Sequence, residues 1–125
     1  MRGTQAPTVV LKDGRPYAAL GTPGGGRIVS TMTILLSNLI DHKMSMQQAI
    51  ESPRFYARDT EKDVSVEARM PKATVETLTQ MGYTFQTLNE FDLFFGGAQG
   101  IVIDRKGGNM MGGADPRRDG AVAGY

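Results

Sequence analysis

The chain has 125 residues, 40% hydrophobic and 22% charged, which is enough for one globular domain over residues 1–125 with a core of its own. Its formal net charge of +1, without long charged runs, argues against nucleic acid and against a charged membrane surface as partners. The absence of cysteine excludes disulfides, thiolate metal sites and a thiol nucleophile, and no apolar run is long enough to cross a membrane.

The first part of the chain predicts a β-hairpin. β-Prone runs at residues 7–12 and 16–21 flank Asp13-Gly14. This dipeptide suits a tight two-residue turn, so the two runs are expected to pair with each other.

Two helices are expected next. From Arg27 to about His42 the apolar residues recur at spacings of three and four and form one broad stripe, made of Ile28, Met32, Leu35, Leu36, Leu39 and Ile40. A shorter helix is expected from Ser45 to Glu51, with Ser45 as its N-cap. It should end before Pro53, because the residue that precedes a proline disfavours helical geometry.

The second half of the chain predicts a mixture of strands and one more helix. Residues 64–68 alternate like a strand. A helix is expected to follow, with Pro71 in its first turn, Gly82 at its end and an apolar face formed by Val75, Leu78 and Met81. Further strands are expected at 84–89, 98–104 and 109–112, the last two joined by a turn through Gly107-Gly108.

These elements predict an α+β fold, with an antiparallel or mixed sheet that helices cover on one face. The runs 9–11, 18–20 and 101–103 are apolar at successive positions, so their strands should be apolar on both faces of the sheet. The uncovered face is then expected to pack against another sheet or subunit that this chain does not supply. The chain is therefore expected to be a fragment.

Three consecutive glycines, Gly24 to Gly26, stand directly before the long helix. Bare backbone lets amide N–H groups approach a ligand, and the helix N-terminus adds partial positive charge, so the loop can hold an anion or an oxyanion. A tight connection from strand to helix is the alternative reading. Neither of the common nucleotide-binding glycine motifs is present.

No other residue type points to a cofactor. His42, the only histidine, stands near the end of a helix, where a structural or solvent-facing role is expected. Five carboxylates are scattered over expected helix ends and a loop, without the spacing of a metal-binding loop; they are Asp41, Glu51, Asp59, Glu61 and Asp63. We therefore expect no metal, nucleotide or organic cofactor.

Five blocks of the sequence, in one order, resemble the C-terminal part of the small subunit of gamma-glutamyltransferases. They are APTVVLKDG, GTPGGGRI, NLIDHKMSMQQAIESPRF, GGAQGIVID and GGADPRRDGAVAGY, and together they run from about Ala6 to Tyr125. The resemblance implies an N-terminal nucleophile hydrolase, whose four-layer αββα sandwich this chain would complete only in part. In that family a precursor cuts itself, and the new N-terminal threonine of the small subunit attacks the gamma-glutamyl amide of glutathione and similar small molecules.

The resemblance also implies partners and a site. The large subunit and the upstream part of the small subunit would complete the sandwich, with self-association as the alternative. After Pro23, Gly24 and Gly25 are expected to present their N–H groups to the oxygen of the tetrahedral intermediate. The compartment is left open, because a signal peptide would lie on another part of the complete protein.

The nucleophile is expected to lie outside this chain. In the family it precedes the hairpin by a long segment, whereas here the hairpin begins at residue 7. Thr4 follows Met1-Arg2-Gly3 and Thr8 lies in the first strand, so neither offers the free α-amino group that activates such a threonine. The isolated chain is therefore expected to be inactive.

Substrate recognition is expected to involve Gly3 and Thr4. Transpeptidases of the family usually carry a Ser-Ser pair at this place, which helps to bind the glutamyl α-carboxylate. Thr4 can supply one hydroxyl and Gly3 cannot. Gamma-glutamyl substrates are expected ahead of the acyl groups of a cephalosporin-type acylase relative. A non-catalytic remnant that keeps the fold and binds a partner subunit is the alternative to an enzyme.

Overall fold

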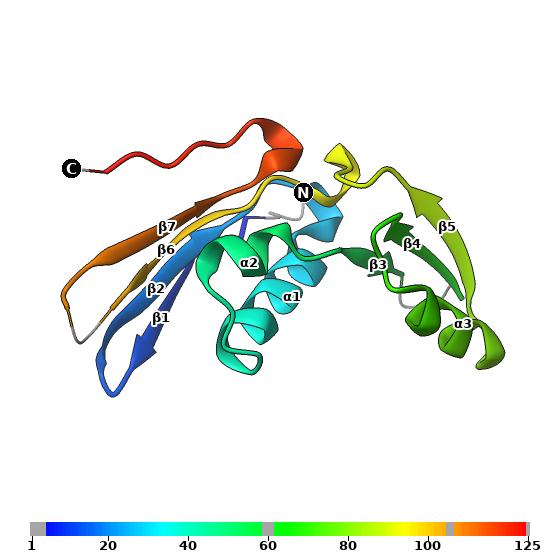
Figure 1. Ribbon diagram of the computed structural model, residues 1–125, viewed down its shortest axis with the longest axis horizontal. Coiled ribbons are helices and arrows are strands. Elements are labelled where there is room, and N and C mark those ends of the chain that lie inside the picture. The colour runs from blue at the N-terminus through cyan, green and yellow to red at the C-terminus, as the bar shows by residue number, and fades with distance from the viewer. Residues whose placement is uncertain (1–4, 59–61, 105–106, 125) are drawn as a thin grey trace.

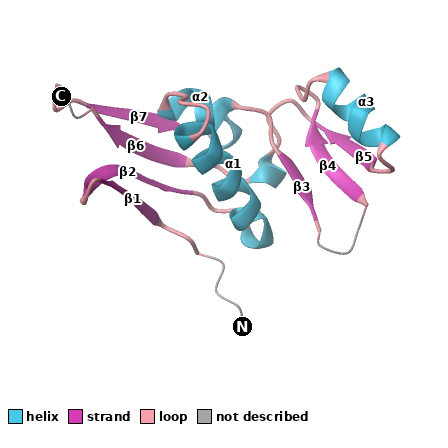
Figure 2. Ribbon diagram, turned by 90° about the horizontal axis from the view of Figure 1, so that it is seen from below, coloured by secondary structure: helices cyan, strands magenta, loops and turns pink. Residues whose placement is uncertain are grey.

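Two separate sheets organise the chain, and they lie side by side rather than stacked (Figures 1 and 2). The computed structural model describes residues 5–58, 62–104 and 107–124. The first sheet is antiparallel throughout, with strand order β1-β2-β6-β7. Its strands are β1 (Thr8–Lys12), β2 (Arg15–Gly21), β6 (Gln99–Ile103) and β7 (Met110–Ala114).

The expected hairpin is confirmed. β1 and β2 pair around Asp13 and Gly14, whose φ angles of 51° and 73° are those of a turn with two left-handed residues. Such a turn matches the twist of the strands that it joins and sets the two pairs nearest to it, but the register shifts by one residue between Leu11 and Val10.

Helices α1 (Ile28–Ile40) and α2 (Met46–Glu51) cover one face of this sheet (Figure 1). Both were expected, and so was the N-cap of α2. Ser45 Oγ accepts from Gln48 N at 3.3 Å, while Ser45 N donates to Gln48 Oε1 at 3.0 Å, which completes a capping box. The core between sheet and helices consists of Ala18, Leu20, Ile28, Met32, Leu35, Leu39, Met46, Ala49, Ile50, Ala98 and Val102.

The opposite face of the first sheet is apolar and largely uncovered. The ladder places Val9, Ala19, Ile101 and Gly112 opposite one another, in a row that crosses all four strands. Val9 is 66% exposed and Ile101 is 40% exposed, although the next residue of β6, Val102, is buried under the helices. The expectation of a second apolar face is therefore confirmed. We call this surface, defined by these four residues, the outer face.

The second sheet was not foreseen as a separate unit. It contains β3 (Phe55–Ala57), β4 (Asp63–Glu67) and β5 (Thr84–Leu88), in the order β3-β4-β5. β3 has only three residues and was missed. β4 and β5 are parallel, and α3 (Lys72–Gln80) makes the crossover that a parallel pair requires. β4 and β5 therefore pair with each other instead of extending the first sheet.

Two details of α3 correct the expectation. Pro71 is the N-cap and does not lie in the first turn. Val75 and Leu78 are partly buried as expected, but Met81 is 67% exposed. The helix ends at Gln80, so Met81 is its C-cap and leaves the apolar face.

The expected class is confirmed: an α+β chain, mostly antiparallel, with helices on one face of the main sheet. Among the described helices, none is long and apolar enough to cross a membrane.

Candidate functional site

A glycine loop connects β2 to α1. Gly24 has φ 153° and Gly25 has φ 59°, values that side-chain-bearing residues rarely adopt. The short turn Gly25–Arg27 then leads directly into α1. Both predicted glycines therefore occupy positions that need glycine for backbone reasons.

The hydrogen bonds of this loop involve its carbonyl groups. The carbonyls of Gly24 and Gly25 accept from Arg27 N and Ile28 N, but within the described residues neither glycine N–H donates to a protein acceptor. A Cβ at Gly25 would have nothing within 4 Å, so this side of the loop is open. Two unpaired N–H groups in front of a helix N-terminus can receive a negatively charged oxygen.

Residues 93–98, which we call the strap, pack against the loop; they form the yellow segment before β6 in Figure 1. Gly96 has φ 89°, and a Cβ there would collide with Pro23 O and lie 2.7 Å from Thr22 Oγ1. Thr22 Oγ1 accepts from Gly97 N at 3.2 Å and donates to Pro23 O at 2.8 Å. The loop and the strap are therefore in direct backbone contact.

The first turns of α1 also hold the strap. Arg27 Nε donates to Phe94 O at 2.6 Å, and its guanidinium lies 4.3 Å from the centre of the Phe94 ring. Thr31 Oγ1 donates to Phe95 O at 3.2 Å. These contacts fix the strap to the same helix that follows the glycine loop.

A buried ionic cluster lies behind the strap. Its members are Arg54, Glu67, Asp115 and Arg117, each at most 3% exposed. Arg54 Nη2 donates to Asp115 Oδ2 at 2.6 Å, and Arg117 donates to Glu67 through Nε and Nη2, both at 2.6 Å. Because Glu67 ends β4 and Asp115 follows β7, the cluster joins the two sheets.

The cluster also reaches the strap. Arg54 Nη1 donates to Phe95 O at 3.0 Å, and Asp115 Oδ2 accepts from Ala98 N at 2.7 Å. Burial lowers the pKa of Arg54, and the attraction of Asp115 only partly opposes this effect. Burial also acts to lower the pKa of Arg117, but hydrogen bonds and attraction from Glu67 and Asp115 outweigh it, so this pKa is raised.

Sequence reasoning missed this cluster. The blocks with SPRF and ADPRR were noted for their resemblance, but nothing in their spacing shows that Arg54 and Asp115 meet. The only available signal was the presence of charged residues next to buried apolar runs, which is too common to identify partners.

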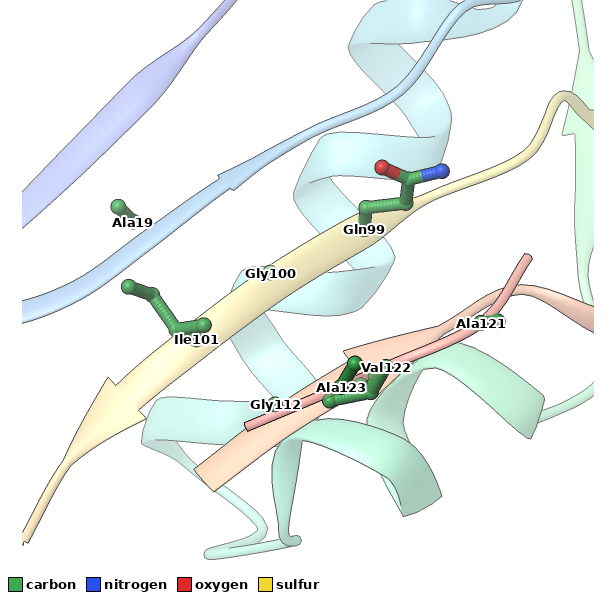
Figure 3. Close-up of a pocket in the computed structure, with 9 residues that line it drawn as sticks. Ala19, Gln99, Gly100, Ile101, Gly112, Ala121, Val122 and Ala123 are labelled. Carbon is green, nitrogen blue, oxygen red and sulfur yellow. The ribbon is translucent and has the colours of Figure 1, made fainter. Parts of the chain in front are cut away.

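A hollow of about 330 Å³ lies on the outer face (Figure 3). Ala19, Gln99 and Ile101 line it from the strands, and the segment 121–123 lies across β7. A Cβ at Gly112 would be 2.5 Å from Val122 Cγ1, so the segment packs tightly on this strand. None of the residues that line this hollow has an ionisable side chain.

The other two predicted site residues, Gly3 and Thr4, lie outside the described residues. His42 is exposed just beyond the end of α1, and its backbone N–H donates to Ser37 O at 3.2 Å. Across residues 5–58, 62–104 and 107–124, no three histidine or acidic side chains gather in a way that could hold a metal ion.

Comparisons with known proteins agree on one family. The family model described as gamma-glutamyltranspeptidase matches residues 1–125. The glutathione hydrolase-like YwrD proenzyme of Bacillus subtilis is 34% identical over 125 residues, which cover 97% of this chain and 24% of that protein. The chain therefore spans about a quarter of this curated relative.

Solved structures give the same answer for the fold. The match to the gamma-glutamyltranspeptidase of Helicobacter pylori covers 91% of this chain and 61% of the matched chain, with 32% identity and a TM-score of 0.81. The match to the cephalosporin acylase of Bacillus halodurans covers 91% of this chain and 21% of the matched chain, with 30% identity and a TM-score of 0.84. These matches confirm the expected fold class, a piece of an N-terminal nucleophile hydrolase sandwich. The chain belongs to the gamma-glutamyltranspeptidase family.

Proposed function

We propose that this chain is the C-terminal part of a gamma-glutamyl transferase or hydrolase and supplies its oxyanion loop. The observation that carries the proposal is the pair of N–H groups on Gly24 and Gly25, which lack protein acceptors in the described chain and stand in a loop that needs glycine. Membership of a family of gamma-glutamyltranspeptidases supports the reaction class.

The proposed reaction passes through an acyl-threonine. A threonine hydroxyl from another part of the protein attacks the amide carbonyl and gives its proton to the threonine's own α-amino group. The carbonyl oxygen becomes an anion that accepts from Gly24 N and Gly25 N. The intermediate then collapses, the amine leaves with that proton, and water or an amino acceptor takes the acyl group.

Fixed dipoles suit this task. Negative charge develops only in the transition state, so N–H groups already held in place lower the barrier without reorganisation. Removing one such donor typically costs on the order of 100- to 1000-fold in rate. The reaction needs no metal or organic cofactor.

Gamma-glutamyl amides are the proposed substrates. The B. subtilis relative is named as glutathione hydrolase-like, which supports this choice. Thr4 would contribute one hydroxyl to the glutamyl α-carboxylate, and Gly3 would contribute none. A cephalosporin-type acyl group is the second candidate, because the acylase of B. halodurans is as similar in structure as the transpeptidases.

The proposed partner is the rest of the same protein. The outer face is apolar, and the second sheet lies beside the first instead of over it. A sheet from the large subunit and the upstream part of the small subunit would cover this face and complete the sandwich. Association between copies of this chain is the alternative for the isolated chain.

The test is Gly25→Val in the complete, self-processed protein. Acylation by a gamma-glutamyl p-nitroanilide should slow by on the order of 100-fold or more, while substrate affinity changes less, because the oxyanion exists only after attack. Gly14→Val is the matched control. Gly14 has φ 73°, and a Cβ there would also have no atom within 4 Å. It lies in the turn before β2, at the end of the strand away from the glycine loop. Folded, processed Gly25→Val protein with parental acylation kinetics would show that the glycines are only a tight connection.

A further inference from the structure

We infer that Thr22 is a positioning residue for the oxyanion loop: its hydroxyl fixes the peptide unit between Pro23 and Gly24, and thereby the direction of the Gly24 N–H. The inference rests on the proposed function of that loop. The proposed role of Thr22 requires no contact with the reacting atoms, because Thr22 acts through the backbone.

The hydrogen bonds of Thr22 are directional. Gly97 N can only donate and Pro23 O can only accept, so the hydroxyl accepts from the first at 3.2 Å and donates to the second at 2.8 Å. One side chain therefore links the strap to the carbonyl that directly precedes Gly24.

The geometry of the peptide unit transmits this contact. No cis peptide bond occurs in the described chain, and in a trans unit the C=O and the N–H point in opposite directions. Holding Pro23 O in place therefore also fixes where the Gly24 N–H points. The N–H cannot turn unless the carbonyl turns with it.

The orientation of this peptide unit must be restrained by a contact from outside it. This unit turns through ψ of Pro23 and φ of Gly24, and the proline ring, which fixes φ of Pro23, restrains neither of these angles. Glycine resists such a turn least of all residues, because it has no Cβ to clash. The freedom that lets Gly24 adopt φ 153° would also let its N–H swing away from the substrate.

The absence of a side chain at Gly96 leaves space for the hydrogen bond between Thr22 and Pro23 O. Any Cβ at residue 96 would collide with Pro23 O and crowd Thr22 Oγ1. The bare backbone of the strap thus borders the carbonyl and its hydroxyl donor, and Arg27, Thr31 and Arg54 anchor the strap from behind. Thr22 is the only one of these side chains that hydrogen-bonds to the Pro23 carbonyl in the described chain.

The experiment compares three variants of the complete, self-processed enzyme. Thr22→Val keeps the shape and removes the hydroxyl, and Thr22→Ser restores the hydroxyl. Thr31→Val is the matched control, because Thr31 also donates a side-chain hydrogen bond to the strap, but to Phe95 O and not to Pro23 O. Single-turnover acylation, steady-state kcat and KM, and thermal unfolding are measured for each variant with a gamma-glutamyl p-nitroanilide.

We expect Thr22→Val to lower the acylation rate by about 10- to 100-fold, with KM within about 3-fold of the parent, because a misdirected donor weakens the transition state more than the bound substrate. Thr22→Ser should recover to within about 3-fold of the parent rate. Thr31→Val should lose thermal stability and keep its rate within the same factor. A hydroxyl that only held the strap would instead give Thr22→Val and Thr31→Val the same profile.

Two results overturn the inference: a parental acylation rate in Thr22→Val, or an equal loss of rate in Thr31→Val. If Thr22→Val does not self-process, the two segments are expressed as separate chains with the threonine already exposed, and the same rates are compared. Failure of the proposed function is recognised separately, because Gly25→Val would then keep its rate. Loss of rate in Gly25→Val together with a parental rate in Thr22→Val rejects only the role of Thr22.

Discussion

Replacing Asp115 by asparagine should remove a large part of the stability of this fold. The Asp115 carboxylate is 1% exposed and accepts four hydrogen bonds. Oδ2 accepts from Arg54 Nη2 and Ala98 N, and Oδ1 accepts from Arg117 N and Arg117 Nη1. Asparagine has the same size but only one acceptor oxygen. Whichever way the amide turns, its NH₂ group faces two donors.

The expected loss is about 3 to 5 kcal/mol, which is the usual effect of removing one partner from a buried ion pair. Two guanidinium groups lose their shared counter-charge, and at least one donor pair is left without an acceptor. A typical domain has only about 5 to 15 kcal/mol of stability in total, so the variant should be close to unfolding.

The assay is urea unfolding of the processed protein, followed by circular dichroism at constant pH. Asp119→Asn is the control, because Asp119 is exposed and has φ 50°, a conformation that asparagine tolerates. It should change the free energy of unfolding by less than about 0.5 kcal/mol. If Asp115→Asn also costs less than about 1 kcal/mol, water reaches the cluster and the argument from burial is wrong.

Two further predictions concern the outer face and Asp92, which directly precedes the strap. Ile101→Lys should reduce self-association of the isolated 125-residue chain in light scattering, since it places a charge on the outer face; Met81→Lys, also exposed but at the end of α3, should leave association unchanged. Hydrogen bonds from Phe94 N and Asn89 hold the pKa of Asp92 below its ordinary value, so its stabilising effect is complete well above the ordinary aspartate pKa of about 4 and disappears as pH falls through the lowered pKa. The stability difference between Asp92→Asn and its parent in urea should therefore be larger at pH 7 than at pH 2, and an equal difference at both values would contradict this reasoning.

Local sequence was a reliable guide where the determinants of structure are local. The turn at Asp13-Gly14 needs two residues that accept left-handed geometry, and the cap at Ser45 needs Gln48 three positions later. α1 needs only its own stripe of apolar residues. Each of these features was predicted because all of its partners lie within a few positions of one another.

The remaining features depend on partners far away in the chain. β3 is too short to carry a pattern of its own and exists because β4 pairs with it. Gly24 and Gly25 were selected from the glycine run and the family resemblance, but the role inferred for Thr22 became visible only when Gly97 was seen beside it. Side-chain chemistry alone does not reveal which backbone group a hydroxyl will meet.

The strand order β1-β2-β6-β7 also has a consequence for how the chain folds. When β2 pairs with β6, Gly21 meets Gln99, so the chain between them must close into one long loop. This loop contains the whole second sheet. The entropy cost of closing a flexible loop rises by about 0.6 kcal/mol for each doubling of its length. The second sheet pairs strands that are closer in sequence, so forming it first shortens the flexible part of that loop. A unit that contributes no strand to the main sheet thereby helps to set the rate at which that sheet can close.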